Sequence, residues 1–232
     1  MTILNLYPDL LHTNGCGGSA LALRKRLKWR GIDAKELIFT VSDKEFPTEQ
    51  INFMIIGDGS PRETAAVTAH LTKFVHEIKE YIEAGGAVFA SGSGFAVLGE
   101  IGALNIKVTP SKSRIIGDIL VQTDLFPGVI IGFENHTAAI DIGNNEPLGT
   151  VMRGAGNNGE DGRDGLVYKG TICTNAGGPT LAKNPQLCDC LIKTALGDIE
   201  ELDDSIEDKV RQFALNFLAE TAVSAQAKCI DA

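Results

Sequence analysis

Residues 87–98 read AVFASGSGFAVL: a short apolar run, a turn of small residues and a second apolar run. Ala87–Ala90 predicts a buried strand, and Phe95–Glu100 predicts a short helix. Between them, the small residues of Ser91–Gly94 predict a tight turn. A strand, a sharp turn and a helix in this order form a nucleophile elbow at the carboxyl edge of a sheet. This stretch therefore favours an α/β fold with a site at that edge.

The residues before the elbow alternate between strand and helix patterns. The continuous apolar run at Asn52–Gly57 is typical of a buried parallel strand. The other expected elements are strands at Thr2–Tyr7 and Ala34–Val41 and helices at Ser19–Arg30 and Thr64–Ala84. We therefore expect one sheet flanked by helices.

The residues after the elbow are richer in strand patterns. Short strands are expected at Ile115–Gln122, Val129–Glu134, Gly149–Arg153, Leu166–Lys169 and Thr171–Cys173. Gly154–Gly165, rich in Gly, Asn and Asp, predicts a polar loop. The chain ends in two helical patterns, Gln186–Leu196 and Ser205–Ala225. The second half should thus be a β-rich part of the same domain.

Composition and charge narrow the class of protein. The 232 residues carry a formal charge of −9, which argues against partners that need a cationic footprint, namely nucleic acid and anionic membranes. No apolar run reaches the roughly 20 residues of a membrane helix, and no cation precedes the first apolar stretch as in a secretory signal. A cytoplasmic protein is expected, with no membrane insertion.

The cluster of basic residues and the cysteines are both expected to be structural features and not functional sites. We expect one solvated helix face to carry the basic residues Arg24, Lys25, Arg26, Lys28 and Arg30. The five cysteines lack a zinc-like double pair, and the close pair Cys188 and Cys190 has no further ligand nearby, so reduced structural thiols and no metal are expected.

The elbow offers weak support for a serine nucleophile. Ser91 or Ser93 would need a histidine base nearby, and the glycine spacing around Ser93 does not match the elbow signature. Of the four histidines (His12, His70, His76, His136), His70 and His76 fall on the expected long helix and should be at the surface.

Two glycine-rich loops follow predicted strands. Gly57-Asp58-Gly59-Ser60-Pro61 should lie at the same sheet edge as the elbow, where its amides could donate to an oxyanion or simply form a turn. Asn14–Ser19 runs from strand into helix and could cradle an anion at the helix N-terminus. Neither loop has the P-loop or dinucleotide pattern, so no nucleotide cofactor is expected.

Several stretches resemble the class I glutamine amidotransferases of the CobB/CobQ type, and among them the glutaminase subunits of lipid II isoglutaminyl synthases. The matching residues are LALRKRLKWRG (21–31), IGDGSPRE (56–63), VLG (97–99), RIIGD (114–118), GFENH (132–136), GAGNNGEDG (154–162), VYK (167–169), GP (178–179) and KNP (183–185). The resemblance implies a flavodoxin-like sheet flanked by helices, with residues 1–200 as the amidotransferase domain and 201–232 as a helical extension packed on it.

The resemblance also implies a catalytic pair that this chain lacks. The family's elbow reads Cys-Gly-Gly-Tyr-Gln-Leu-Leu-Gly, and the aligned run Gly92–Gly99 has glycine in place of the cysteine. The family's base lies in Tyr-Leu-His-Gly-Pro, and the aligned run Asn175–Pro179 has Gly177 in place of the histidine. An acidic residue in the first loop and a glutamine in the elbow are also absent. Arg114, which resembles an arginine that holds the glutamine carboxylate, is kept.

Three hypotheses for function follow. The first is an inactive amidotransferase-like subunit that docks on a Mur-ligase-like partner. The second is an active amidohydrolase with a relocated nucleophile: Cys16 paired with His136, or a serine of the elbow. The third is a binder of glutamine or another small carboxylate, with Arg114, Gly57, Asp58, Gly59 and Ser93 as the ligand-binding residues. The catalytic positions Gly92 and Gly177 favour the first.

Overall fold

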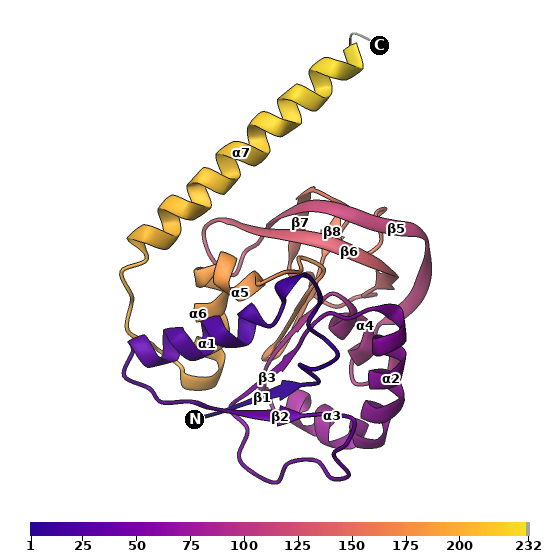
Figure 1. Cartoon of the computed structure of the whole chain (residues 1–232), viewed down its shortest axis with the longest axis vertical. Helices are drawn as coiled ribbons and strands as arrows, with labels where there is room; N and C mark the ends of the chain where they lie inside the picture. The colour runs from indigo at the N-terminus through magenta and orange to yellow at the C-terminus, as the bar shows by residue number, and fades with distance from the viewer. Residues whose placement is uncertain (231–232) are drawn as a thin grey trace.

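The computed structural model describes residues 1–230, with side chains for all of these except 112 and 219–230. Its centre is a six-stranded sheet of order β2-β1-β3-β4-β10-β9, in which all neighbouring strands are parallel except β9 and β10 (Figure 1). The strands are β1 (Thr2–Leu6), β2 (Lys35–Phe39), β3 (Phe53–Ile56), β4 (Ala87–Ser91), β9 (Leu166–Tyr168) and β10 (Thr171–Thr174). The β2-β1-β3-β4 order is that of the flavodoxin-like doubly wound sheet.

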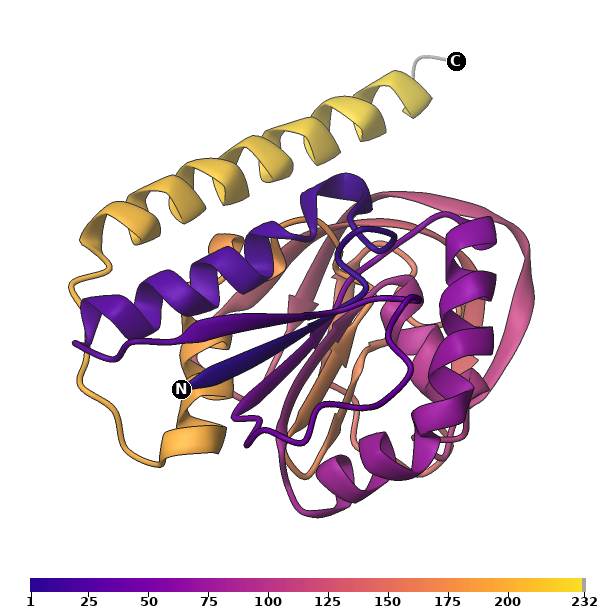
Figure 2. The same cartoon turned by 60° about the horizontal axis from the view of Figure 1, so that its bottom comes forward.

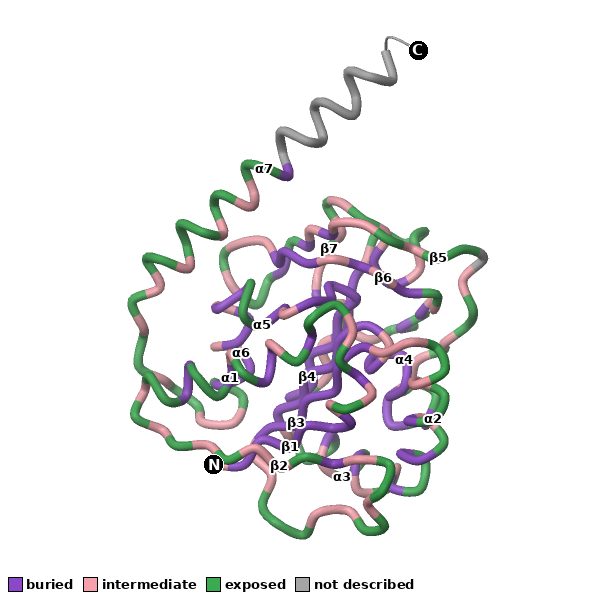
Figure 3. The backbone as a smooth tube through the Cα atoms, viewed as in Figure 1, coloured by how far each residue is buried: buried purple, intermediate pink, exposed green. Residues whose placement is uncertain are grey.

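Helices cover both faces of this sheet (Figure 2). One face carries α1 (Gly18–Trp29), α5 (Thr180–Lys183) and α6 (Pro185–Leu196), and the other carries α2 (Pro61–Leu71), α3 (Val75–Glu83) and α4 (Ser93–Glu100). Successive residues of one strand face opposite layers: Phe53 and Ile55 pack with α1 and α6, and Met54 packs with α2 and α3. Burial on both faces explains the continuous apolar runs of the central strands, which are buried along their length (Figure 3).

The β-rich second half forms a four-stranded antiparallel sheet of order β6-β5-β7-β8. Its strands are β5 (Lys107–Gln122), β6 (Val129–Asp141), β7 (Gly149–Arg153) and β8 (Arg163–Asp164). The chain then returns to the central sheet through β9 and β10, so the two sheets belong to one body.

The last helix, α7 (Ser205–Ile230), is fastened to this body through its first half. The guanidinium of Arg211 donates to the backbone oxygens of Lys183 and Val129, and the Arg153 side chain donates to the Leu218 carbonyl. No helix among residues 1–230 is both long and apolar enough to cross a membrane.

The expected helix at Thr64–Ala84 is wrong in its continuity and its start. It begins at Pro61, where Ser60 and Glu63 form a reciprocal capping box. It breaks at the 3₁₀ turn η2 (Thr72–Phe74), where the Thr72 hydroxyl donates to the Thr68 carbonyl, a bond that bends helices. The break lets Phe74 pack edge-on against Phe39, with ring centroids 5.3 Å apart.

The surface placement expected for His70 is also wrong. Its ring is 9% exposed, with Nδ1 2.8 Å from the Tyr7 hydroxyl and Nε2 2.9 Å from the Asp43 carbonyl. Both nitrogens are satisfied within the aromatic cluster around Phe39, so this histidine is structural.

The basic residues of α1 do not all lie on a solvated face. Arg26 is 3% exposed and forms bidentate pairs with Asp189 of α6 and Asp204, and Arg30 also binds Asp189. The chain segment that leads into α7 is thereby tied to α1 and α6. The other three residues, Arg24, Lys25 and Lys28, are exposed.

We expect Arg26→Met to destabilise the protein by about 3 kcal/mol, because two carboxylates would lose the cation that they share. Urea denaturation followed by circular dichroism measures the change. Lys28→Met on the exposed face of the same helix is the control, with an expected effect within about 0.5 kcal/mol. Equal effects of the two substitutions would contradict a stabilising role for the ion network.

Candidate functional site

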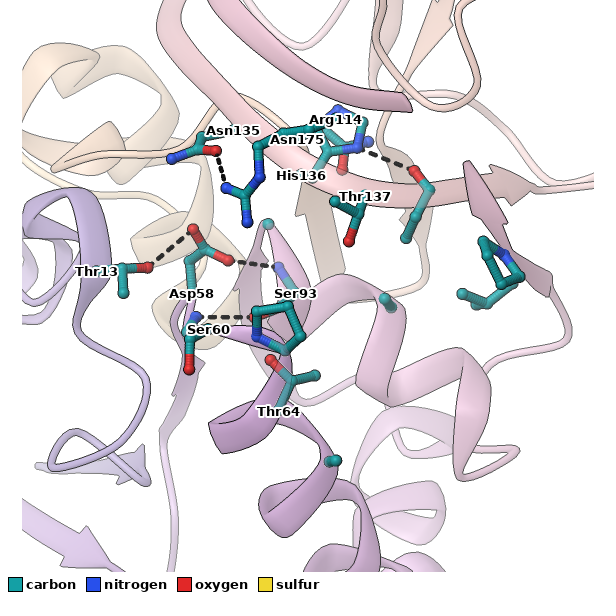
Figure 4. Close-up of a pocket in the computed structure, with 18 of the residues that line it drawn as sticks. Thr13, Asp58, Ser60, Thr64, Ser93, Arg114, Asn135, His136, Thr137 and Asn175 are labelled. Atoms are coloured by element: carbon teal, nitrogen blue, oxygen red, sulfur yellow. Dashed lines mark hydrogen bonds between the residues drawn. The ribbon is translucent and has the colours of Figure 1, made fainter. Parts of the chain in front are cut away.

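A cavity of about 390 Å³ opens where the carboxyl ends of β3 and β4 meet the hairpin of β5 and β6 (Figure 4). Its lining combines the loop after β1, the N-termini of α2 and α4 and the inner side of the hairpin. The lining residues used below are Thr13, Asn14, Asp58, Gly59, Thr64, Gly92, Ser93, Arg114, Asn135 and His136. Of the expected ligand-binding residues, Arg114, Asp58, Gly59 and Ser93 lie on this cavity.

The turn between β4 and α4 has the backbone of an elbow. Gly92 adopts φ 57° and ψ −125°, a conformation that residues with a side chain rarely adopt. The amide of Gly92 donates to the Thr174 carbonyl, and its own carbonyl accepts from the amide of Phe95. A side chain at position 92 would point toward Asp58, because a Cβ built there would lie 2.7 Å from the Asp58 carboxylate. The space of a nucleophile is therefore occupied by an acid from the neighbouring strand end.

The Asp58 carboxylate is held by three neutral donors. Its Oδ1 accepts from the amide of Ser93 at 2.9 Å, and its Oδ2 accepts from the Thr13 hydroxyl at 3.1 Å and the Asn14 amide at 3.0 Å. The side chain is 4% exposed. The loop after β1 thus binds an anion of the chain itself, through the side chains of Thr13 and Asn14 and not at the N-terminus of α1 where an anion was expected.

The amides expected to serve a ligand make internal bonds. In enzymes with such an elbow, the amide that follows the nucleophile is an oxyanion donor; here that amide belongs to Ser93 and binds Asp58. The amide of Gly59 donates to the Ser93 hydroxyl at 2.9 Å, and the amide of Asp58 donates to the sulfur of Cys16. Gly57 does not line the cavity, and it faces the Leu11 carbonyl and the Cys16 sulfur. Of the two alternatives for this loop, the bonded amides of Asp58 and Gly59 favour a turn over an oxyanion donor.

Gly177, the position aligned with the family's base, lies in a backbone bridge with Phe133. The Gly177 amide donates to the Phe133 carbonyl at 3.0 Å, and the Phe133 amide donates to the Gly177 carbonyl at 3.3 Å. Position 177 thus contributes backbone to the contact between the central sheet and β6, and no imidazole.

The relocated pair of Cys16 and His136 is not assembled. Cys16 is 2% exposed rather than accessible, and its sulfur donates to the Leu11 carbonyl. Burial raises the pKa of the Cys16 thiol, which disfavours the reactive thiolate. His136 lines the cavity from β6, and its Nδ1 donates to the Ala138 carbonyl at 2.9 Å. No hydrogen bond joins the two side chains, both of which the structure describes.

The serines of the elbow also lack a bonded histidine. Ser91 is 1% exposed at the end of β4. The Ser93 hydroxyl lines the cavity and accepts from the Gly59 amide. The geometry of neither serine favours nucleophilic chemistry.

Arg114 projects from β5 over the cavity toward Asp58 (Figure 4). Its guanidinium donates to the side-chain oxygen of Asn135, whose amide nitrogen donates to the Asn14 oxygen at 3.4 Å. Asn14 in turn donates to Asp58. A chain of aligned amides therefore links the cation on one wall with the anion on the floor.

Two buried carboxylates, Glu134 and Asp164, hold the loop 154–165 between the hairpin and the central sheet. This role was not predicted. Glu134, beside His136 on β6, accepts from the amides of Ala155 and Gly156. Asp164 accepts from the Thr174 hydroxyl and from Asn175 at the end of β10, so the loop spans the two sheets. Full burial raises the pKa of Asp164. The only sequence signal was the dense run of Asn, Asp and Gly.

The contact between Gly92 and Asp58 can be measured with a double-mutant cycle. We expect Gly92→Ala to cost about 1–2 kcal/mol more in the natural background than in Asp58→Gly, because the added methyl overpacks against the carboxylate only in the first. Chemical denaturation of the four proteins gives the coupling.

Gly102→Ala is the matched control. Gly102 also has a positive φ, 75°, but an added Cβ there meets nothing within 4 Å. Its substitution should cost the same in both backgrounds. If Gly92→Ala and Gly102→Ala both prove independent of Asp58, the occupied elbow is refuted.

The sequence of the chain is similar to a known protein family and to two known proteins. A family model described as the CobB/CobQ-like glutamine amidotransferase domain matches residues 27–185. The lipid II isoglutaminyl synthase (glutamine-hydrolyzing) subunit GatD of Staphylococcus aureus (strain N315) is 32% identical, with 92% of this chain and 91% of the relative covered. The protein of the same name from Streptococcus pneumoniae is 29% identical, with 84% and 80% covered.

Solved structures agree with the fold. The structure of PurLQS from Thermotoga maritima superposes with a TM-score of 0.60 at 15% identity, covering 84% of this chain and 97% of that one. A glutamine amidotransferase from the same organism gives a TM-score of 0.55 at 15% identity, with 75% and 74% covered. At these identities the likeness concerns the fold alone, and it confirms the α/β architecture expected from the sequence.

Proposed function

Because the chain belongs to the CobB/CobQ-like glutamine amidotransferase family, we propose that it is a non-hydrolysing member that serves as a subunit in the amidation of lipid II. One observation carries the proposal. The Asp58 carboxylate lies where a nucleophile at position 92 would project, and it accepts the hydrogen bond of the Ser93 amide.

The chemistry of amide hydrolysis explains why this arrangement is inactive. Hydrolysis of glutamine through a covalent intermediate requires a nucleophile and a proton shuttle, and glycine at positions 92 and 177 supplies neither. In serine proteases that have lost their catalytic residues, the oxyanion hole and substrate binding still give about 10³–10⁴-fold acceleration over water. Here an internal carboxylate competes for the oxyanion donor, so even this residual catalysis should be lost.

Both relatives are named as subunits of lipid II isoglutaminyl synthases, and this supports the proposed role in lipid II amidation. The family resemblance implies a Mur-ligase-like partner that binds ATP and lipid II. A role beside such a ligase would be cytoplasmic, and the chain would dock, conduct ammonia or regulate assembly.

The first half of α7 has a face suited to such docking. Arg211 and Leu218 face the body, and Leu218 is 7% exposed. Another face carries apolar side chains at intervals of four, three and four residues, and they are 58–74% exposed: Ile206, Val210, Phe213 and Phe217. An exposed apolar stripe on a helix is typical of a protein interface. We propose that the partner subunit covers it.

A glutaminase assay tests the proposed inactivity. We expect ammonia release from glutamine to equal the background rate, both for the chain alone and with its co-expressed Mur-ligase-like subunit. The glutamine-hydrolyzing relative from S. aureus is the positive control. Turnover lost in Cys16→Ser would support the relocated nucleophile instead, and turnover that survives this substitution would equally refute inactivity.

Affinity purification tests the docking face. Phe213→Asp should reduce recovery of the Mur-ligase-like subunit at least tenfold, because a charge in the centre of an apolar interface lacks a partner. Lys209→Asp, an exposed residue of the same helix outside the stripe, should leave recovery unchanged. Equal recovery with both variants would show that α7 is not the docking element.

A further inference from the structure

The Asp58 carboxylate forms no ion pair with a described residue. Among the residues whose side chains the structure describes, no ion pair to Asp58 exists within 4.0 Å, although the group is 4% exposed. Its three donors are a backbone amide, a hydroxyl and a side-chain amide. A carboxylate has about four acceptor positions, so one remains available. The N-terminus of α4 compensates part of the charge, but buried charges are normally paired with an opposite charge.

Arg114 carries a positive charge, and it forms no ion pair with a carboxylate among the described residues. Its one hydrogen bond to a described residue goes to the neutral Asn135 oxygen, although a guanidinium has five N–H donors. The amides of Asn135 and Asn14 separate this cation from Asp58 and are oriented by both charges. The two charges thus face the same cavity from different walls (Figure 4).

Two further polar groups on the cavity wall make no hydrogen bond within the described part of the protein. They are the buried Thr64 hydroxyl, near the start of α2, and the buried Nε2 of His136, which has only the Glu134 carboxylate at 3.8 Å beside it. Buried polar atoms are nearly always hydrogen-bonded in proteins, and an exception calls for an explanation such as a functional role or a bound water or ion. These groups and the two charges point to a polar occupant of the cavity.

We propose that the cavity binds a small zwitterion, with an ammonium group on Asp58 and a carboxylate on Arg114. This assignment deepens the proposed function and rests on its claim that no glutamine amide is hydrolysed at the elbow. An amide oxygen directed at position 92 would meet the Asp58 carboxylate, whereas an ammonium group there completes an ion pair. The substitution of Asp58 for the nucleophile would thus change the end group that the floor of the cavity recognises.

Calorimetric titration of the full chain with a series of ω-amino acids tests the proposal. The probes are glycine, β-alanine, γ-aminobutyrate and δ-aminovalerate, which differ in the separation of the two charges. Butyrate and butylamine are the controls with a single charge. We expect the best zwitterion to bind about tenfold or more tightly than either control, as loss of a charge-assisted hydrogen bond implies.

Two substitutions test which residue binds each end of the ligand. Asp58→Asn should weaken the best zwitterion about tenfold or more without weakening butyrate, and Arg114→Gln should weaken both ligands. Circular dichroism verifies that the variants fold. Because Arg114 is exposed, its variant and the comparison of the best zwitterion with butyrate and with butylamine decide the matter even if Asp58→Asn does not fold.

The results that would overturn the proposal are distinct from those that bear on the proposed function. Butyrate binding as tightly as every zwitterion would mean a site for carboxylates alone. Absence of binding throughout the series would mean that Arg114 and the two amides satisfy Asp58 by themselves. Either result, with partner recovery intact and no glutamine turnover, refutes the zwitterion site alone. Turnover of glutamine refutes the proposed function and with it the premise of the zwitterion site.

Discussion

The site depends on one buried carboxylate and the amide that it binds. Asp58, at the end of β3, accepts from Ser93 at the start of α4, and it also holds Thr13 and Asn14 of the loop after β1. Three segments that are distant in the sequence are thereby joined at the floor of the cavity. Gly92 permits this arrangement, because any side chain there would compete with the carboxylate for the same space.

The consequence is a fold that keeps the backbone of an elbow while its oxyanion donor is bound internally. A preorganised amide accelerates acyl transfer only if it is free to meet the charge that develops in the transition state. Once a carboxylate accepts that amide, the same geometry becomes a binding surface with a negative charge. The charge on Asp58 therefore links the two proposals, that of a non-hydrolysing subunit and that of a zwitterionic ligand.

The cavity also needs its second wall, which the β5–β6 hairpin supplies. Glu134 and Asp164 accept hydrogen bonds from the backbone on either side of the junction between the sheets. Because both carboxylates are buried, leaving either of them unpaired would be costly, and the network holds the hairpin over the site. Arg114 and His136 reach the cavity only through this placement.

Periodicity predicted the central elements well, because apolar runs such as 53–56 are buried on both faces of a parallel sheet. It failed where tertiary contacts override local pattern. The helix break before Val75 serves the aromatic cluster around Phe39, and the buried Arg26 and His70 are satisfied by residues far along the chain. The hairpin strands β5 and β6 extend through stretches that carry no strand signal, and β5 even includes Pro110.

The sequence by itself determined the α/β class, the elbow and the absence of sulfur and imidazole at positions 92 and 177, because these follow from residue identity and short-range pattern. Only the tertiary structure decided what takes their place. That Asp58 fills the elbow, that Cys16 is buried away from His136, and that Arg114 faces an acid across the cavity are relations between separate strand ends. Such relations depend on how the sheets pack, and no local periodicity encodes them.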